Sequence, residues 1–554
     1  MAAVTDMAHA TSMTMQSVTT SLATSLATSE ERPSATAAPD GAASALRVNW
    51  AVIVVIAAAA AGVLALQAFL HGHFSALDEY DDGVYFGASI ELFHGLLPYR
   101  DFAFIQPPMI TVWMLPFAAV SSVTGTAAAM EAARFFVDIV SVTNVVLVGV
   151  LVRRRTTLQV IVATGLMAFS QGTIRSSQTI LLEPFLVLAC LIALLCLLDG
   201  EGITTSARRL WWCGAFFGMA GATKVWAILP FAAVVIVLSR RGHRSRRKVI
   251  GGAIVGFVAC SFPFIIGAPA SFFQQVVLTQ AVRNAGGLPF PQRLADLTGI
   301  PMLSTSIAKG SPFGSLVLSL VLIALGTAAV VSWRRRREAP WLPLARVAGW
   351  SPLLVGCALL ISPTYYYHYS GFMAPFSALL VSSMMGHLSP RVRHVGALRP
   401  STRKAVTSGA VVSALTLLLA LVIHEVVRLP VAPHIGDTLS DAIPGHGCVL
   451  YSDPALALLD NRFTADIGGC PSVIDWFGQE RVLDEGRSVT VSDTSNGHLQ
   501  EVMNHWIKSS DAVVLQHGNL GLDSANVSYL QHHFDQEEHL PRGLRIYMRD
   551  SARA

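Results

Sequence analysis

The sequence predicts a polytopic α-helical membrane protein with a small α/β domain outside the membrane. Of its 554 residues, 53% are hydrophobic and only 13% are charged, a composition outside the range of soluble globular proteins. Apolar segments long enough to cross a bilayer recur along most of the chain, whereas the last part alternates short apolar runs with polar stretches. Basic runs follow alternate apolar segments, as a single membrane topology requires.

The chain begins with a polar segment, residues 1–48, which is rich in Ser, Thr, Ala and Met and has no apolar periodicity. This composition predicts a disordered cytoplasmic tail. Because the first apolar segment follows so long a polar leader, we interpret it as an uncleaved anchor and not as a signal peptide.

Residues 49–428 contain the predicted transmembrane domain. A helix needs about 20 apolar residues to cross the hydrocarbon, and we expect about 11 spans. They are residues 49–70, 132–152, 157–173, 180–198, 209–223, 225–239, 248–267, 313–333, 347–364, 370–387 and 405–427.

Basic runs set the expected orientation of these spans, because cytoplasmic loops carry an excess of Lys and Arg. The runs are at residues 153–155, 208–209, 240–248, 334–337 and 391–404. Their alternation places the N-terminus in the cytoplasm and a loop, residues 71–131, outside. A span at 108–123 would break that alternation, so we predict a helix on the outer surface there.

Residues 429–554 are expected to form an extracytoplasmic α/β domain, with short apolar runs at 448–451, 472–476, 511–516 and 544–548. Its two cysteines, Cys448 and Cys470, lie on the oxidising side of the membrane, where we expect a disulfide between them. Two free thiols are the alternative, because a sequence does not show the distance between them. A glycosylation sequon begins at Asn526.

The most informative stretch is the acidic segment that follows the first span. Asp78, Glu79, Asp81 and Asp82 lie within five positions of one another. Carboxylates so crowded repel one another and need a solvated face, a cation or a chemical role. Their place directly after a membrane span indicates work on a lipid-linked substrate.

Other polar residues gather at the ends of the spans that the topology assigns to the outside. A charge at membrane depth costs about 2.5–3.5 kcal/mol on insertion scales, so it tends to mark a pathway or a site. Lys224 has apolar sequence on both sides, and a lipid phosphate is a natural partner for it. Alternatively, Lys224 extends to the interface or pairs with Glu183 for folding alone.

Several motifs together resemble the GT-C superfamily of membrane glycosyltransferases, especially the branch with protein O-mannosyltransferases and lipid A aminoarabinose transferase. In chain order they are Asp81-Asp82-Gly83-Val84-Tyr85, the stretch 95–99, Pro107-Pro108, Ala132-Ala133-Arg134, Leu182-Glu183-Pro184 and Thr223-Lys224. The resemblance covers residues 49–390. It departs at Asp82, where members usually carry Glu.

This resemblance implies transfer of a sugar, hexose or pentose, from a polyprenyl-phosphate donor to a cell-envelope glycan, lipid or protein, with inversion. Asp81 would be the general base, and Asp82 would orient it or bind the acceptor. Cations would stabilise the departing phosphate. The expected phosphate-binding residues are Lys224, Arg175 and His368, and the expected substrate-binding residues are Tyr85, Tyr99, Glu183, Tyr366 and Tyr369.

No cofactor is required if the donor arrives activated. Clustered carboxylates would suit Mg²⁺ or Mn²⁺, but no further spacing commits them to a metal, and the cysteines form no zinc motif. No nucleotide-binding motif stands out and no nucleic-acid partner is expected. A transporter or flippase for a lipid-linked or glycan substrate is the alternative, in which the same charges line a path.

Overall fold

The computed structural model describes residues 40–281, 286–335, 342–392, 400–427, 435–443, 447–463, 470, 473–475, 478–479, 497–516, 521–534, 536–540 and 543–549. The chain divides into the unit Met1–Val48 and the unit Asn49–Ala554, and the second holds every feature discussed below. Residues 1–39 of the predicted tail lie outside the described residues. Residues 40–48, the end of this predicted tail, are helical and not disordered, because α2 (Asp40–His71), the first helix among the described residues, begins at Asp40.

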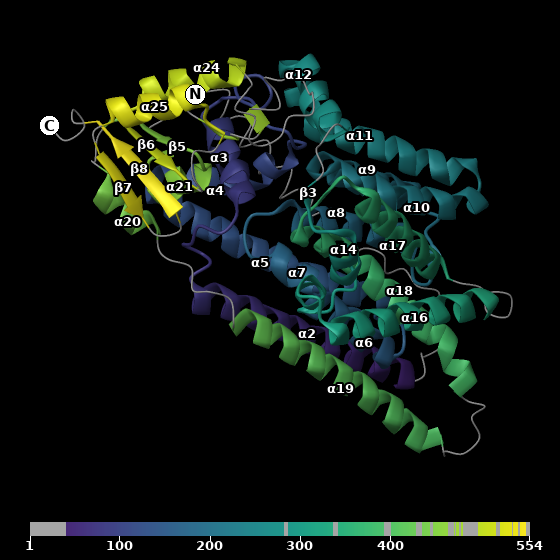
Figure 1. The fold of residues 1–554 in the computed structure, drawn as a ribbon. Helices are drawn as coiled ribbons and strands as arrows, with labels where there is room; N and C mark the ends of the chain where they lie inside the picture. The colour runs from purple at the N-terminus through teal and green to yellow at the C-terminus, as the bar shows by residue number, and fades with distance from the viewer. Residues whose placement is uncertain are drawn as a thin grey trace. The chain divides into compact units, whose positions relative to one another are not determined.

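Each predicted span corresponds to a helix (Figure 1). These helices are α2 (Asp40–His71), α5 (Thr126–Val152), α6 (Thr157–Phe169), α8 (Leu182–Leu197), α9 (Ala207–Thr223), α10 (Ile228–Leu238), α11 (His243–Gly267), α16 (Pro312–Arg335), α17 (Pro343–Ile361), α18 (Ser370–Val392) and α19 (Pro400–Val427). Within the described residues, 5 segments are long and apolar enough to cross a membrane by themselves. They are Ser44–Leu70, Thr126–Val152, His243–Gly267, Pro312–Val331 and Pro343–Ile361. Several of the others are shorter, so the number of 11 stays a prediction.

Large apolar side chains cover the outside of the helical bundle. Phe313 and Ile323 of α16 are 74% and 64% exposed, and Ile254 and Ile266 of α11 are 59% and 64% exposed. Water would penalise so much contiguous apolar surface, whereas lipid would not. The protein is therefore a multi-pass membrane protein.

Helices α9 and α11 pack through glycines. A Cβ atom on Gly214 or Gly218 of α9 would lie 2.1 or 2.2 Å from a backbone oxygen of α11. On Gly252 or Gly256 of α11 it would lie 2.3 Å from a backbone oxygen of α9. These backbones approach as closely as only glycine allows, which is typical of membrane helix pairs.

The segment between α2 and α5 is more ordered than the loop that we expected. The surface helix predicted at 108–123 is α4 (Met109–Thr124), and Pro108 caps its start. A second helix, α3 (Tyr80–Phe93), was not predicted and contains Asp81 and Asp82 in its first turn. Two glycines and the two acids of its first turn obscure its pattern in the sequence.

The C-terminal domain is built on a four-stranded mixed sheet with the order β5-β6-β8-β7. The strands are β5 (Val449–Tyr451), β6 (Ala512–Leu515), β7 (Gln536–Leu540) and β8 (Leu544–Met548). Strands β5 and β6 are parallel, and the other pairs are antiparallel. The apolar runs at 448–451, 511–516 and 544–548 thus form strands, but the described part of 472–476, residues 473–475, does not.

Helices cover both faces of this sheet. On one face, α24 (Gly497–Lys508) and α25 (Ser524–His533) pack against Leu450, Val513 and Tyr547. On the other face lie α20 (Ile435–Ala442) and α21 (Pro454–Leu459) (Figure 1).

Two sequence features of the C-terminal domain have structural roles. Cys448 and Cys470 form a disulfide. Asn526 of the sequon is buried, and its side-chain amide donates to the backbone oxygen and to Oε1 of Gln500. The sequon therefore serves packing in the folded domain.

Candidate active site

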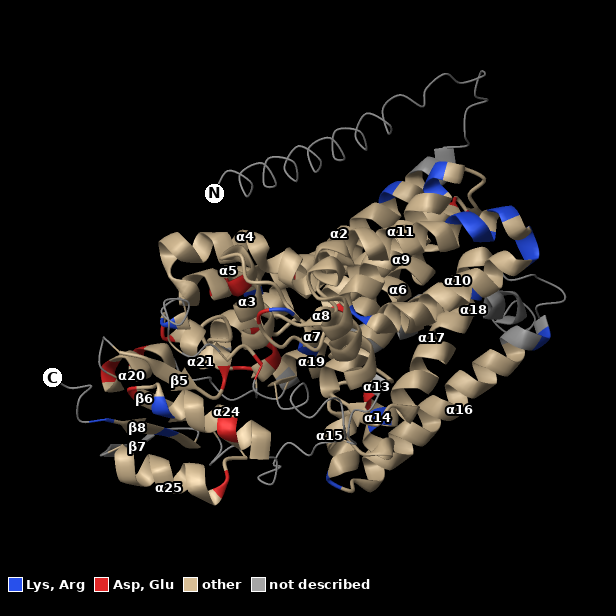
Figure 2. Ribbon diagram, turned by 90° about the horizontal axis from the view of Figure 1, so that it is seen from above, with Lys and Arg blue, Asp and Glu red and all other residues tan. Residues whose placement is uncertain are grey.

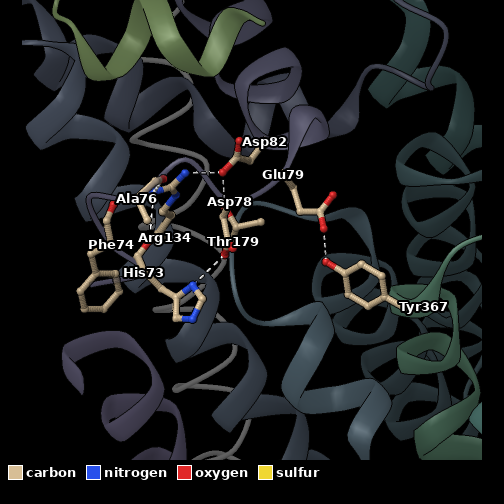
Figure 3. Close-up of polar contacts among 9 residues, drawn as sticks. All are labelled: His73, Phe74, Ala76, Asp78, Glu79, Asp82, Arg134, Thr179 and Tyr367. Atoms are coloured by element: carbon tan, nitrogen blue, oxygen red, sulfur yellow. Dashed lines mark hydrogen bonds and ion pairs between the residues drawn. The ribbon is translucent and has the colours of Figure 1, made fainter. Parts of the chain in front are cut away.

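The acidic segment enters α3, and its carboxyl groups diverge toward different partners (Figure 3). Glu79 is the extended N-cap residue, and Asp81 and Asp82 follow in the first turn, where negative charge is favoured by the helix dipole. Asp78 precedes them and contacts His73 Nδ1 at 3.0 Å. Helix geometry thus separates side chains that the sequence places side by side.

Asp82 is a buried structural carboxylate. It is fully buried and accepts hydrogen bonds from Arg134 and Thr179 (Figure 3). Arg134, 1% exposed, also donates to the backbone oxygens of His73, Phe74 and Ala76 at 2.7–2.9 Å. This network fixes α3 and the segment before it against α5. The expectation that Asp82 binds the acceptor does not fit this burial, because a substrate hydroxyl has no access to it.

Asp81 faces away from that network and is only half-buried. The hydroxyl of Tyr85, one turn later in α3, donates to Asp81 Oδ2 at 3.0 Å. Burial raises the pKa of Tyr85 well above its usual range, and the charge of Asp81 adds to this. Tyr85 therefore stays a neutral donor that orients Asp81, and because it is 3% exposed it does not fit the expected role of direct substrate contact.

Glu79 contacts the aromatic run at 365–369. Its carboxyl group accepts a hydrogen bond from the hydroxyl of Tyr367 (Figure 3). Burial raises the pKa of Glu79 to about 7, and the nearby Asp81 and Asp78 contribute to the rise. Glu79 is thus a second titratable carboxyl group beside Asp81. Glu79 belongs to the acidic segment, and Tyr367 lies between the predicted site residues Tyr366 and His368, but the contact between Glu79 and Tyr367 was not predicted.

Lys224 lies where the helical backbone is interrupted. It caps α9 in an extended conformation before the short helix η1 (Val225–Ala227). Its Nζ is 2.6 Å from Oε1 of Glu183, in the first turn of α8. The pairing that we considered as an alternative is therefore present, and Glu183 is only 1% exposed. Irregular backbone at membrane depth is tolerated where it lines a cavity.

Aromatic rings surround the ammonium group of Lys224. Its Nζ lies 4.1 Å from the ring centroid of Tyr369 and 4.7 Å from that of Trp226. These two rings pack edge to face, with centroids 4.5 Å apart. Such rings attract a cation electrostatically and exclude water from it. Trp226 was not predicted as a site residue, although it stands two positions after Lys224 in the sequence.

The remaining predicted residues of this region follow the same aromatic run. The guanidinium of Arg175, in α7 (Gln171–Ser176), lies 5.5 Å from the ring centroid of Tyr367. His368 is buried and stacks on Tyr366, which is 40% exposed. Lys224 and Arg175 thus contact two rings of one short segment.

A cavity of about 270 Å³ opens beside Lys224. It is lined by Gln106, Pro107, Lys224, Val225, Trp226, Gln280, Ser362, Pro363, Thr364 and Tyr369. The lining combines a cation, aromatic rings and side-chain amides, so it suits an anionic group attached to a polar one.

Tyr99 is not part of the cavity lining, but it holds Gln106, which is. Its hydroxyl donates to the backbone oxygen of Gln106 at 2.6 Å, and its ring packs against Phe104 and Phe272. It is 3% exposed and has a positive φ of 70°. The predicted substrate contact does not fit this placement, because Tyr99 fixes the turn that presents Gln106.

The acids of this site do not converge on a metal. Among the residues that the structure describes, no group of three or more His, Cys, Asp or Glu side chains could hold a metal ion. Asp78, Glu79 and Asp82 each face a different partner (Figure 3). The use of Mg²⁺ or Mn²⁺ stays a prediction.

Comparison with known proteins agrees with this architecture. Residues 118–245, less than half of the chain, match the model of the dolichyl-phosphate-mannose-protein mannosyltransferase family. A search of curated protein sequences gives no match.

Solved structures resemble the chain over most of its length. ArnT from Cupriavidus metallidurans bound to undecaprenyl phosphate has a TM-score of 0.56 at 16% identity, covering 89% of this chain and 97% of that one. Its apo state has a TM-score of 0.53 at 15% identity, with the same coverage. The apo oligosaccharyltransferase of Archaeoglobus fulgidus has a TM-score of 0.51 at 12% identity, covering 91% of this chain and 74% of that one. The chain thus shares the fold of these proteins over most of its length.

Proposed function

We propose that this protein is a glycosyltransferase that moves a sugar from a polyprenyl-phosphate donor to a cell-envelope acceptor outside the cytoplasmic membrane. One observation carries the proposal: the ammonium group of Lys224 lies at the wall of a cavity, and its partners Glu183 and Tyr369 act electrostatically on Tyr85, the residue that holds Asp81. A cation for a phosphate and a base for a hydroxyl are the two groups that such a transfer needs. The fold shared with a protein crystallised with undecaprenyl phosphate supports it.

In this proposal Asp81 takes the proton of the acceptor hydroxyl as its oxygen bonds to the anomeric carbon of the sugar. The bond between that carbon and the phosphate oxygen breaks, and polyprenyl phosphate leaves with the electron pair. Attack from the face opposite the phosphate inverts the anomeric configuration. Tyr85 holds Asp81 in place through its hydrogen bond.

Lys224 stabilises the charge that develops on the departing phosphate. The carboxylate of Glu183, 2.6 Å away, balances the charge of the buried ammonium in the absence of donor. The aromatic rings of Tyr369 and Trp226 keep water from the ammonium, which strengthens its attraction for an anion. Arg175, on the other side of the aromatic run, is a second cation for the phosphate or the sugar.

Charge placement supports an extracytoplasmic site. Figure 2 shows Lys and Arg gathered where α10 ends and α11 begins, apart from the acidic residues of α3 and α24. Helix α5 links the two regions: Arg153 follows its last turn, whereas Thr126 at its start donates to the backbone oxygen of Leu458 in the C-terminal domain. Because basic ends face the cytoplasm, Asp81 and the C-terminal domain would lie outside.

The experiment is transfer of radiolabelled sugar from a panel of polyprenyl-phosphate sugars to cell-envelope acceptors by purified protein. Wild type should consume at least one donor, and Asp81→Asn should lose transfer by at least about 100-fold, the size of a general-base contribution. Asp437→Asn, a change at an exposed aspartate of α20, is the matched control.

Two results would count against the proposal. Wild-type turnover by Asp81→Asn would remove Asp81 as the base. If wild type consumes no donor in the panel, a lipid-flipping assay becomes the test of the transporter alternative.

A further inference from the structure

The C-terminal domain packs directly on the helix that carries Asp81. A Cβ atom on Gly83 of α3 would lie 2.3 Å from the backbone nitrogen of Ala455 in α21. One turn later, a Cβ on Gly87 would lie 2.9 Å from the ring of Phe463. Gly83 and Gly87 therefore form one face of α3, and the C-terminal domain fills it.

The turn that touches Gly83 is held by Asp453. This residue caps α21, and its Oδ1 accepts from the backbone nitrogen of Ala455 at 2.9 Å. Asp453 is 4% exposed and follows strand β5, so the sheet fixes its position. A second contact lies at the start of α3, where the hydroxyl of Tyr80 donates to Asp475 Oδ1 at 3.0 Å.

The same helix of the C-terminal domain is also attached to the membrane bundle. Thr126 Oγ1 at the start of α5 donates to the backbone oxygen of Leu458 at 2.6 Å. The backbone nitrogen of Ala127 donates to Asn461 Oδ1 at 3.0 Å. Helix α21 is therefore held between α5 and α3, and its position determines that of the first turn of α3.

We propose that the C-terminal domain completes the active site by positioning the first turn of α3, with Gly83 as the contact and Asp453 as the positioning residue that sets the 453–455 turn. This inference rests on the proposed function, since it concerns the placement of the base Asp81. It gives the C-terminal domain a role in turnover besides any role in holding the acceptor.

The charge of Asp453 matters to the same turn of α3. Burial raises its pKa to about 8, and the acidic groups of α3 and its cap, Asp82, Glu79 and Asp81, add to the rise. Asp453 is therefore neutral at pH 7 and becomes an anion above about pH 8. The new charge would repel the carboxylates of α3 and move the turn that holds Asp81.

The first test is Gly83→Ala, which forces α3 away from α21. A displacement of about 1 Å at a reacting group lowers turnover by about 100-fold, so we expect that fall in kcat with a donor KM within about twofold of wild type. The control is Gly326→Ala in α16, where a Cβ meets nothing within 4 Å. A folded Gly83→Ala protein with the kcat of this control would overturn the proposal.

Variants of Asp453 test the inference if Gly83→Ala fails to fold. Asp453→Ala removes the acceptor for Ala455 N, and kcat should fall by about tenfold, a modest displacement on the same scale. Asp453→Asn restores an acceptor that cannot ionise, so it should rescue most of that loss. It should also move the alkaline decline of kcat, expected above about pH 8 in wild type, to higher pH. An unchanged kcat in Asp453→Ala, or a pH profile of Asp453→Asn that coincides with wild type, would overturn the role of Asp453.

Hydrogen exchange separates this inference from the proposed function. If wild type transfers no sugar, the proposed function fails, but amides of α3 should still exchange faster in Asp453→Ala than in wild type. Unchanged exchange in α3 would overturn the positioning role itself. If wild type is active and the variants match their controls, only the inference fails.

Discussion

Two neighbouring carboxylates, Asp81 and Asp82, differ in role because a helical turn points them in different directions. Asp82 is paired with Arg134 in the protein interior, whereas Asp81 is half-buried and contacts only Tyr85 among the described hydrogen bonds. A buried ion pair that loses one partner leaves the other charge uncompensated. The two residues should therefore separate stability from chemistry.

We predict that Asp82→Asn lowers the free energy of unfolding by about 3–5 kcal/mol, because it leaves the buried guanidinium of Arg134 without a charged partner. Asp81→Asn should retain the melting temperature of wild type, since the amide oxygen still accepts from Tyr85. Thermal melting of the two purified variants, monitored by size-exclusion chromatography, measures the difference. A wild-type melting temperature for Asp82→Asn would contradict the structural role of this pair.

Lys224 pairs with Glu183 in the folded protein and is proposed to bind phosphate. A double mutant separates its contribution to folding from its contribution to phosphate binding. Lys224→Met alone should destabilise the protein by about 3–5 kcal/mol, because Glu183 is left buried without its partner. Adding Glu183→Leu should restore most of that stability, since apolar replacement of a buried pair is often neutral.

The double variant should nevertheless fail to bind polyprenyl phosphate, the group that leaves in the proposed reaction. Ligand that binds the folded state raises the melting temperature, so undecaprenyl phosphate should stabilise wild type and not the double variant. Equal stabilisation of both proteins would show that Lys224 serves folding alone.

Glu79 gives the protein a pH-dependent stability. Its pKa is about 7 in the folded protein against 4.5 in the unfolded chain, so the folded state binds the proton more tightly. The free energy of unfolding should therefore fall as pH rises from about 4.5 to 7 and then level off. Glu79→Gln should remove this decline, so at pH 8 its free energy of unfolding should exceed that of wild type by on the order of 1–3 kcal/mol and its melting temperature should be higher.

The melting temperatures of Glu79→Gln and wild type at several pH values check this pH dependence of stability. The control is Glu501→Gln, at an exposed position of α24, which should follow wild type throughout. If the melting temperatures of Glu79→Gln and wild type differ by the same amount at every pH from 5 to 8, the pH dependence does not come from Glu79.

At the scale of elements, the helices that could be predicted are those with a long apolar sequence. The hydropathy of each span is a local property, so the predicted segments 132–152 and 248–267 end at the same residues as α5 and α11, although the two helices begin earlier, at Thr126 and His243. Helix α3 was missed because its Gly83 and Gly87 pack against another domain, and a local pattern does not contain that partner. The contacts of Asp82 with Arg134 and of Glu79 with Tyr367 were missed for the same reason.

The glycine contact between α9 and α11 makes an element-scale prediction. Gly252→Ala places a Cβ 2.3 Å from the backbone oxygen of Trp211, so the two helices must separate. Overpacking of this kind costs about 1–3 kcal/mol. Gly326→Ala on α16 has open space and should be neutral or slightly stabilising. Thermal melting compares the two, and an unaltered melting temperature of Gly252→Ala would mean that α9 and α11 do not pack this closely.

At the scale of the whole molecule, the order of chemistry-bearing motifs could be predicted, whereas the attachment of the C-terminal domain to the active site could not. Asp81, Glu183, Lys224 and Tyr369 were all named from the sequence, because charge and aromaticity at membrane depth are unusual wherever they occur. The role of Asp453 beside α3 was not predicted, since an aspartate before a proline in a small α/β domain resembles any helix cap. Only the fold shows that it lies against α3.

The topology that connects these parts can be tested by thiol labelling. Ser239→Cys, exposed at the end of α10 beside a basic run, should react with a membrane-impermeant maleimide only after cells are permeabilised. Ser509→Cys, exposed after α24 in the C-terminal domain, should react in intact cells. Both changes belong in a background in which the free cysteines, Cys190, Cys196, Cys213, Cys260 and Cys357, are replaced by Ala and the disulfide is kept. Labelling of Ser239→Cys in intact cells would invert the topology and place Asp81 in the cytoplasm, where a donor and acceptor of the proposed kind would not meet it.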